Sequence, residues 1–170
     1  MRTGLRVALI VAGIAAAAVA AMPRSTDDGE KIYLSRCSSC HQADGMGIAG
    51  VFPPLVETDW VTGDKGRLIR IVLGGMMGEV KVNGVIYSGA MPPWKSFMTD
   101  EEVAAMLTYV RSAWENSASA VTAHEVSQVR KATADRSTSW TAEELMQKTN
   151  QGIPGSLNAL FSPADTTEHR

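Results

Sequence analysis

A pentapeptide near the N-terminus constrains this chain more than any other feature. It reads Cys37-Ser38-Ser39-Cys40-His41 and has the C-x-x-C-H form that attaches a c-type haem. Two thiols three positions apart can each form a thioether with one porphyrin, and the imidazole that follows is then held beneath the iron. Cys37 and Cys40 are the only cysteines, so no second C-x-x-C can complete a zinc site. The motif therefore predicts one haem c, covalently bound through Cys37 and Cys40, with His41 as an iron ligand.

A haem iron bound by histidine needs a second axial group, a water or an open position. The chain has nine methionines, and Met91 lies in the segment Gly89-Ala90-Met91-Pro92-Pro93-Trp94. The two prolines fix the backbone and remove amide donors, which suits a segment that holds a thioether against iron. We therefore predict Met91 as the second metal ligand, with Met76, Met77 and Met98 as fallback candidates.

The N-terminus has the pattern of an export signal. Arg2 and Arg6 precede an uncharged run over 7–21, and Ala18-Val19-Ala20 has the small-x-small form that signal peptidase cuts. That run is shorter than the ~20 residues that a membrane-spanning helix needs. We expect a signal peptide over 1–20, a periplasmic or otherwise exported protein, and no membrane span in the mature form. An uncleaved N-terminal anchor, which would keep the protein membrane-associated, is the alternative.

The rest of the chain divides into a segment over 25–115 and a tail over 116–170. The first segment holds the strong local signals. They predict a helix capped by Asp27 or Asp28 that leads to Cys37, and a second helix over 65–73 that stops at Gly74-Gly75. A β-hairpin around Asn83-Gly84 and a helix opened by the capping box Thr99-x-x-Glu102 follow. The tail is rich in Ser, Ala and Thr and carries two more capping boxes, Thr122 with Glu125 and Thr141 with Glu144. It is expected to be helical, without a part in the haem chemistry, and disordered towards its end.

The charge balance limits the classes of partner. Sixteen basic and eighteen acidic residues give a formal net charge of −2. A nucleic-acid-binding protein leaves a basic footprint, which this chain lacks. We therefore expect no nucleic-acid partner.

The segment from Gly29 to Trp114 resembles a class I, monohaem c-type cytochrome domain of the bacterial periplasmic kind. The matching elements are Gly29 with Tyr33, Cys37-Ser38-Ser39-Cys40-His41, Phe52-Pro53-Pro54-Leu55, Met91-Pro92-Pro93-Trp94, and a final helix with Leu107 and Tyr109. The resemblance implies an all-α cytochrome c fold of three to five helices around one covalent haem, with the first and last helices crossing at Gly29. The small β-hairpin insertion and the helical C-terminal tail are similar to cytochrome c domains that accompany periplasmic or membrane-bound dehydrogenases and nitrite reductases.

The resemblance also implies contacts around the haem. In this family a proline carbonyl accepts the free ring N–H of the proximal histidine, and Pro53 matches that position; the alternative is that Pro53-Pro54 is only a rigid loop. Trp60 and Arg67 carry an indole N–H and a guanidinium, which could bind haem propionates. Trp60 could equally be a core aromatic.

These features together predict a one-electron carrier rather than an enzyme. With His41 and Met91 both on the iron, no coordination site is left for a substrate. Donor and acceptor are expected to be redox proteins that meet an exposed haem edge through a small, transient interface. Two alternatives stay open: a tightly bound cytochrome c subunit of a larger dehydrogenase, nitrite reductase or terminal oxidase, and a haem enzyme or gas sensor with an open sixth position.

Overall fold

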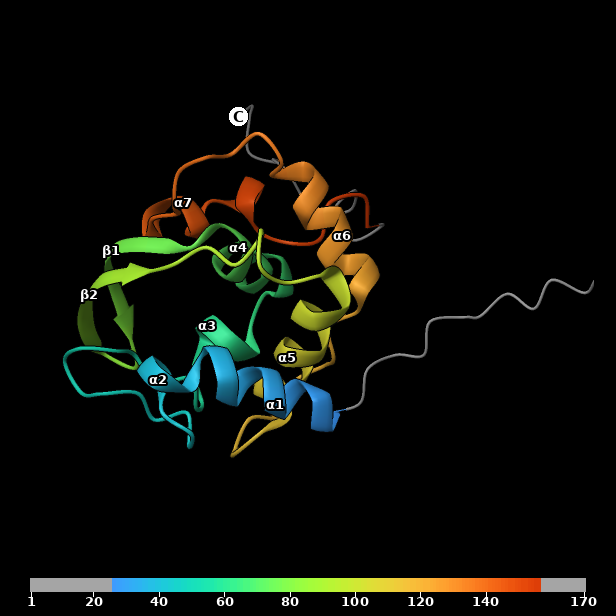
Figure 1. The fold of residues 1–170 in the computed structure, drawn as a ribbon. Coiled ribbons are helices and arrows are strands. Elements are labelled where there is room, and N and C mark those ends of the chain that lie inside the picture. The colour runs from blue at the N-terminus through green and yellow to red at the C-terminus, as the bar shows by residue number, and fades with distance from the viewer. Residues whose placement is uncertain (1–25, 157–170) are drawn as a thin grey trace, which may run out of the picture.

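The computed structural model describes residues 26–156, which form seven α-helices, one 3-10 turn and one two-stranded sheet (Figure 1). The elements are α1 (Thr26–Arg36), α2 (Ser38–His41), α3 (Asp59–Thr62), α4 (Lys65–Gly74), β1 (Met76–Val82), β2 (Val85–Met91), α5 (Asp100–Ser112), α6 (Ala123–Ala132), α7 (Ala142–Met146) and η1 (Lys148–Asn150). No helix in this described part is long and apolar enough to cross a membrane. The expected signal peptide over 1–20 and the end of the tail lie outside the described residues.

The crossing of α1 and α5 joins the two ends of the segment that contains the C-x-x-C-H motif (Figure 1). The backbones meet at Gly29, where an added Cβ would collide with the carbonyl oxygen of Ala105, so the predicted crossing is confirmed. Tyr33, which is fully buried one turn later, packs edge-on against Trp114 with 5.3 Å between ring centroids. Asp27 and Asp28 lie inside the first turn of α1 rather than capping it, which corrects the expected helix start. There they face the positive end of the helix dipole.

Helix α4 and the hairpin of β1 and β2 have the predicted form. Asp64 caps the start of α4, since its side chain accepts the backbone N–H of Arg67 at 2.6 Å, and Gly75, with φ +72°, caps its end. Asn83 and Gly84 both have positive φ, as a tight hairpin turn requires. The hairpin is longer than the alternation around Asn83-Gly84 suggested, because β1 and β2 pair from Met76 opposite Met91 to Val82 opposite Val85. Met91 is therefore the last residue of a strand.

The tail completes the hydrophobic core. All three predicted capping boxes are present, at the starts of α5, α6 and α7. Val126 and Val129 of α6 are fully buried in the same cluster as Tyr33 and Leu107. Trp140 and Leu145 form a second buried cluster with Ile71 of α4. The tail is helical as expected, and the core of the chain includes its side chains.

Candidate functional site

One helical turn presents the three side chains of the C-x-x-C-H motif. Within it the backbone N–H groups of Cys40 and His41 both donate to the carbonyl oxygen of Cys37, at 3.2 and 3.0 Å. All three side chains are partly buried. The turn is fixed at its exit because the hydroxyl of Tyr33 donates to the carbonyl oxygen of Gln42 at 2.5 Å. Both thiols and the imidazole therefore project from one rigid segment at the end of α1.

The imidazole of His41 is oriented by a loop carbonyl. Its Nδ1 atom lies 3.0 Å from the carbonyl oxygen of Pro53, the contact that the resemblance implied. With the proton on Nδ1, the Nε2 atom carries the lone pair that a metal can bind. Burial lowers the pKa of His41, and the hydrogen bond to Pro53 opposes this effect. The loop between the two residues is closed by paired backbone hydrogen bonds between Ile48 and Phe52, at 2.9 and 2.8 Å.

The chemistry of the donor set fits a haem attached through thioethers. Cys37 and Cys40 are free thiols, and burial raises the pKa of Cys37 to about 11. Redox-active C-x-x-C pairs and zinc sites depend on a thiolate, which a raised pKa disfavours. Among residues 26–156, no three His, Cys, Asp or Glu side chains gather so that they could hold a metal ion by themselves. Two free thiols beside an imidazole with a lone pair on Nε2 suit attachment to a porphyrin.

Met91 is the last residue of β2 and the first of the segment 91–95, which contains Pro92 and Pro93 and is called the proline segment below. It is half-buried and packs against both hydrophobic clusters. The segment 91–95 is fixed beyond the prolines, where the N–H groups of Trp94 and Lys95 donate to the carbonyls of Val72 and Leu73 at 3.0 and 3.1 Å. Both ends of the proline segment are therefore held, one by β1 and the other by the last turn of α4.

The fallback methionines lie in three different environments. Met98 is only 5% exposed and belongs to the main core, which is the position of a packing residue. Met77 is half exposed on β1. Met76 is opposite Met91 in the sheet and packs beside it. Of these four residues, Met91 alone combines partial burial with a backbone that the two following prolines fix.

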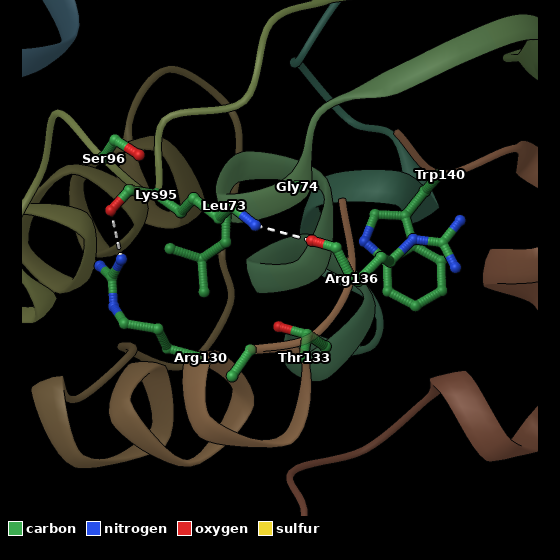
Figure 2. Close-up of a pocket in the computed structure, with 9 residues that line it drawn as sticks. Leu73, Gly74, Lys95, Ser96, Arg130, Thr133, Arg136 and Trp140 are labelled. Carbon is green, nitrogen blue, oxygen red and sulfur yellow. Dashed lines mark hydrogen bonds between the residues drawn. The ribbon is translucent and has the colours of Figure 1, made fainter. Parts of the chain in front are cut away.

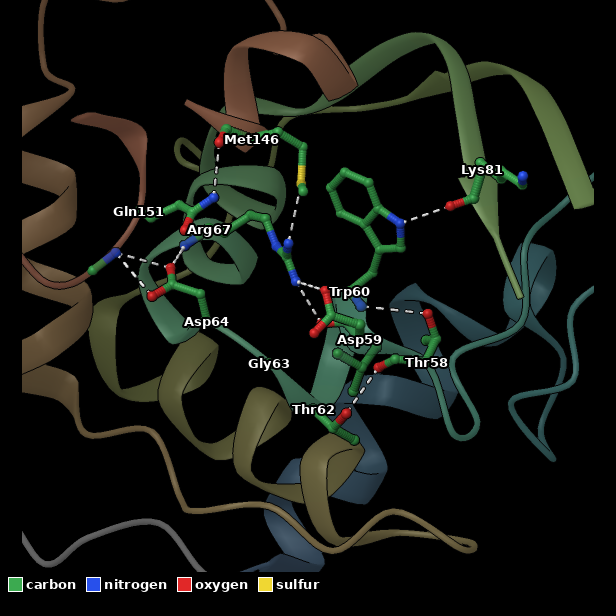
Figure 3. Close-up of polar contacts among 12 residues, drawn as sticks. Thr58, Asp59, Trp60, Thr62, Gly63, Asp64, Arg67, Lys81, Met146 and Gln151 are labelled. Atoms are coloured by element: carbon green, nitrogen blue, oxygen red, sulfur yellow. Dashed lines mark hydrogen bonds and ion pairs between the residues drawn. The ribbon is translucent and has the colours of Figure 1, made fainter. Parts of the chain in front are cut away.

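Trp60 and Arg67 lie together (Figure 3), and the indole N–H and the two terminal guanidinium nitrogens bind protein groups, whereas the buried Nε of Arg67 has no hydrogen-bond partner among the residues that the structure describes. The indole N–H of Trp60 donates to the carbonyl oxygen of Lys81 in β1 at 2.9 Å, and the Arg67 guanidinium lies over its ring, 4.7 Å from the centroid. Arg67 also donates to the carboxylate of Asp59 at 2.6 Å and contacts the sulfur of Met146 at 3.3 Å. The expected propionate contacts of Trp60 and Arg67 stay predictions. To bind a propionate, the indole N–H of Trp60 or a terminal nitrogen of Arg67 would have to leave its present partner.

Asn116 is a supporting residue that the sequence reasoning missed. It is 5% exposed, and its side-chain amide donates to the carbonyl oxygens of Leu55 and Val110 at 3.0 and 2.8 Å. Its side-chain oxygen accepts the N–H of Glu57 at 2.8 Å. Asn116 therefore ties the loop that carries Pro53 to the end of α5. An asparagine at the start of a Ser- and Ala-rich stretch gives no sequence signal for this role.

Comparisons with known proteins place the chain among electron-transfer haem proteins. The profile of a family described as cytochrome C oxidase, cbb3-type, subunit III matches residues 24–110. A cytochrome c-552 of Thermus thermophilus is 41% identical over 91 residues, which cover 51% of this chain and 68% of that protein. The cytochrome c subunit of a quinone alcohol dehydrogenase of Gluconobacter oxydans (strain 621H) is 33% identical over 143 residues, which cover 82% of this chain. This chain spans 30% of that subunit's length.

Proposed function

We propose that this chain, which belongs to the cytochrome c family described as cytochrome C oxidase, cbb3-type, subunit III, carries single electrons between redox proteins through one His/Met-ligated haem. Its family makes it an electron-transfer protein with covalently bound haem c. The seven helices and the small antiparallel sheet over 26–156 fit a cytochrome c fold. Five of these helices precede Asn116, in keeping with the three to five that the resemblance implied.

The proposal assigns a role to each residue of the site. Cys37 and Cys40 hold the porphyrin, His41 and Met91 bind the iron, and Pro53 orients His41. The observation that carries this assignment is the 3.0 Å contact between Nδ1 of His41 and the Pro53 carbonyl, which leaves the Nε2 lone pair for iron. We propose 25–115 as the haem-binding segment and 116–170 as its tail.

The bound haem supplies the Fe(III)/Fe(II) couple. The contribution of the chain is to fix both axial groups, so that little has to move when the charge of the site changes. A neutral thioether from Met91 favours the reduced state relative to two nitrogen ligands. With His41 and Met91 both bound to the iron, the site would favour electron transfer over the binding of oxygen or peroxide.

We place the protein outside the cytoplasm, either periplasmic or held at the membrane by its N-terminal segment. The pattern over 1–21 supports export, and c-type haem is attached on the oxidising side of the membrane. Its partners would be a donor and an acceptor of electrons that meet it transiently.

The axial assignment is tested with the variant Met91→Ala and the matched variant Met77→Ala. Met91→Ala should keep the covalent haem, lose the charge-transfer band between thioether and ferric iron, lower the reduction potential and bind carbon monoxide rapidly when reduced. Met77 is half exposed, so Met77→Ala should match the wild type in all four measurements. A Met91→Ala spectrum identical to wild type would transfer the assignment to Met98 or Met76. A wild-type protein without the band would favour the haem enzyme or gas sensor.

A second candidate is a cytochrome subunit of a larger dehydrogenase. The match to the quinone alcohol dehydrogenase subunit favours this candidate. The match covers 82% of this chain, so it extends past Asn116 into the tail wherever it begins. A truncation after residue 116 cannot test this candidate, since it would remove Val126 and Val129 from the core. The size of the haem-containing species in a native membrane extract does test it. A large complex supports the subunit, whereas a species of about the mass of the chain alone supports the free carrier.

A further inference from the structure

Trp140, in the tail, extends the sheet next to the proposed iron ligand. Its backbone N–H donates to the carbonyl oxygen of Gly75 at 3.0 Å, and its carbonyl accepts the N–H of Met77 at 2.8 Å. These two bonds pair Trp140 with Met76 in a parallel bridge. On the other edge of β1, Met76 pairs with Met91. Trp140 and Met91 are therefore neighbours of the same residue, one on each side of β1.

The three side chains of this row lie on one face. Directly paired residues of adjacent strands point to the same side of a sheet. Accordingly Met76 and Met91 both pack against the cluster formed by Ile71, Trp140 and Leu145. Trp140 is 4% exposed and Leu145 is fully buried, so this support is part of the core. The tail thus contributes the apolar backing of the strand end that carries Met91.

The indole of Trp140 is itself held in place, as Figure 2 shows. The guanidinium of Arg136 lies 3.6 Å from its ring centroid, and the ammonium of Lys95 donates to the carbonyl oxygen of Arg136 at 2.7 Å. On its other side the ring touches the backbone of α4 so closely that a Cβ on Gly74 would lie 2.7 Å from its Nε1. Arg136 and the backbone of α4 therefore both contact the ring of Trp140.

The proline segment is held by the same short stretch of backbone. A Cβ on Gly75 would lie 2.6 Å from the carbonyl oxygen of Met91 and 2.9 Å from the nitrogen of Pro93. Gly74 and Gly75 are thus in contact with Trp140 on one side and with the proline segment on the other. A displacement of Trp140 would be transmitted to Met91 through Gly75 and Met76.

We propose that Trp140 is a positioning residue for Met91, which holds the thioether on the iron by fixing β1 and the proline segment from the side of the tail. This inference rests on the proposed function, in which Met91 is the axial ligand. Its consequence is that the tail controls how often the thioether detaches from the iron.

The rate at which ferric protein binds added imidazole measures that detachment, since imidazole can bind only after the thioether leaves. Trp140→Ala should raise the rate at saturating imidazole by about tenfold or more, and Trp140→Phe, which keeps an aromatic ring in the cluster, by about threefold. The thioether–iron band of Trp140→Ala should also disappear at a lower temperature than that of the wild type. The double variant Val126→Ala/Val129→Ala is the matched control, because both side chains are fully buried in α6, which packs on α4 and α5. It should lower the unfolding temperature while leaving the imidazole rate within about twofold of wild type.

The outcomes separate this inference from the proposed function. If Met91→Ala keeps the thioether–iron band, Met91 is not the ligand and the axial assignment fails first. If Met91→Ala loses the band while Trp140→Ala binds imidazole no faster than the double control, the role of Trp140 alone is overturned. Should Trp140→Ala not accumulate as folded protein, the comparison is between Trp140→Phe and the double control. A rate for Trp140→Phe equal to that of the control then overturns the inference.

Discussion

Nδ1 of His41 lies 3.0 Å from the carbonyl oxygen of Pro53, twelve residues further along the chain. The contact orients the ring before any iron is bound, because both residues are fixed by the backbone around them. His41 is held within the turn that begins at Cys37, and the loop to Pro53 is closed by the paired bonds of Ile48 and Phe52. A preset imidazole needs little reorganisation when iron changes charge, which is what an electron carrier requires.

We expect His41→Ala to lose most of its covalently attached haem, because no second imidazole lies in the turn that carries both thiols. Haem staining of the exported protein after denaturing electrophoresis measures this directly. The matched control is His124→Ala, which removes the same side chain from an exposed position on α6. That variant should stain like the wild type, and a similar loss in both variants would contradict the role of His41.

Local signals were sufficient for the elements that frame the site. The capping boxes of Thr99, Thr122 and Thr141 and the hairpin turn at Asn83-Gly84 depend on residues within four positions of each other, so the sequence predicts them correctly. The cofactor followed from the C-x-x-C-H motif for the same reason.

Long-range contacts could not be predicted in this way. Trp140 bonds to Gly75 and Met77, more than sixty residues earlier, and nothing in its own segment indicates that pairing. The propionate contact considered for Trp60 rests on its donor alone and stays a prediction, and no local signal indicates that its indole N–H donates to the carbonyl of Lys81, twenty-one residues away. Asn116 was overlooked because a buried polar side chain is recognised only by the backbone groups that surround it.

Asn116→Asp should destabilise the fold strongly for a change of almost no volume. The carboxylate cannot donate to Leu55 and Val110, so two backbone carbonyls lose their hydrogen bonds and a charge is placed where the side chain is 5% exposed. Losses of this kind cost about 1–3 kcal/mol each, so we expect a decrease of about 3 kcal/mol in the free energy of unfolding by denaturant. Asn83→Asp is the control, because Asn83 is exposed in a turn that aspartate also tolerates. It should remain within about 0.5 kcal/mol of wild type.

Arg67→Lys should also be destabilising, although it conserves the charge. The guanidinium of Arg67 bonds to Asp59 and Met146 and lies over the ring of Trp60, a combination that an ammonium cannot reproduce. We expect a loss of about 1–2 kcal/mol, which for a chain of this size lowers the unfolding temperature by several degrees. Arg36→Lys makes the same substitution at an exposed position, where the guanidinium lies 5.6 Å from the ring centroid of Trp94, and it should lower the unfolding temperature much less. Equal effects in the two variants would show that the Arg67 contacts add nothing to stability.

The stability of the tail should depend on pH through Glu144, which closes the capping box of α7. The backbone N–H of Thr141 and the guanidinium of Arg136 hold the pKa of Glu144 below its ordinary value of 4.5. A group whose pKa is lower in the folded state stabilises the fold above its unfolded value and loses that contribution as pH falls through the folded value. The contribution should therefore be complete above about pH 4.5 and disappear below it.

Glu144→Gln tests this by removing the titrating group while keeping the shape of the cap. Unfolding temperatures measured from pH 7 to pH 3 should show the variant less stable than wild type at neutral pH, by less than about 1 kcal/mol because the ion pair is partly exposed. The two curves should converge as the pH falls below 4.5, since protonated Glu144 has lost the same interactions. Glu143→Gln, an exposed neighbour on the same helix, should run parallel to the wild type throughout. A constant difference between Glu144→Gln and wild type across this range would contradict the lowered pKa and indicate a loss of packing instead.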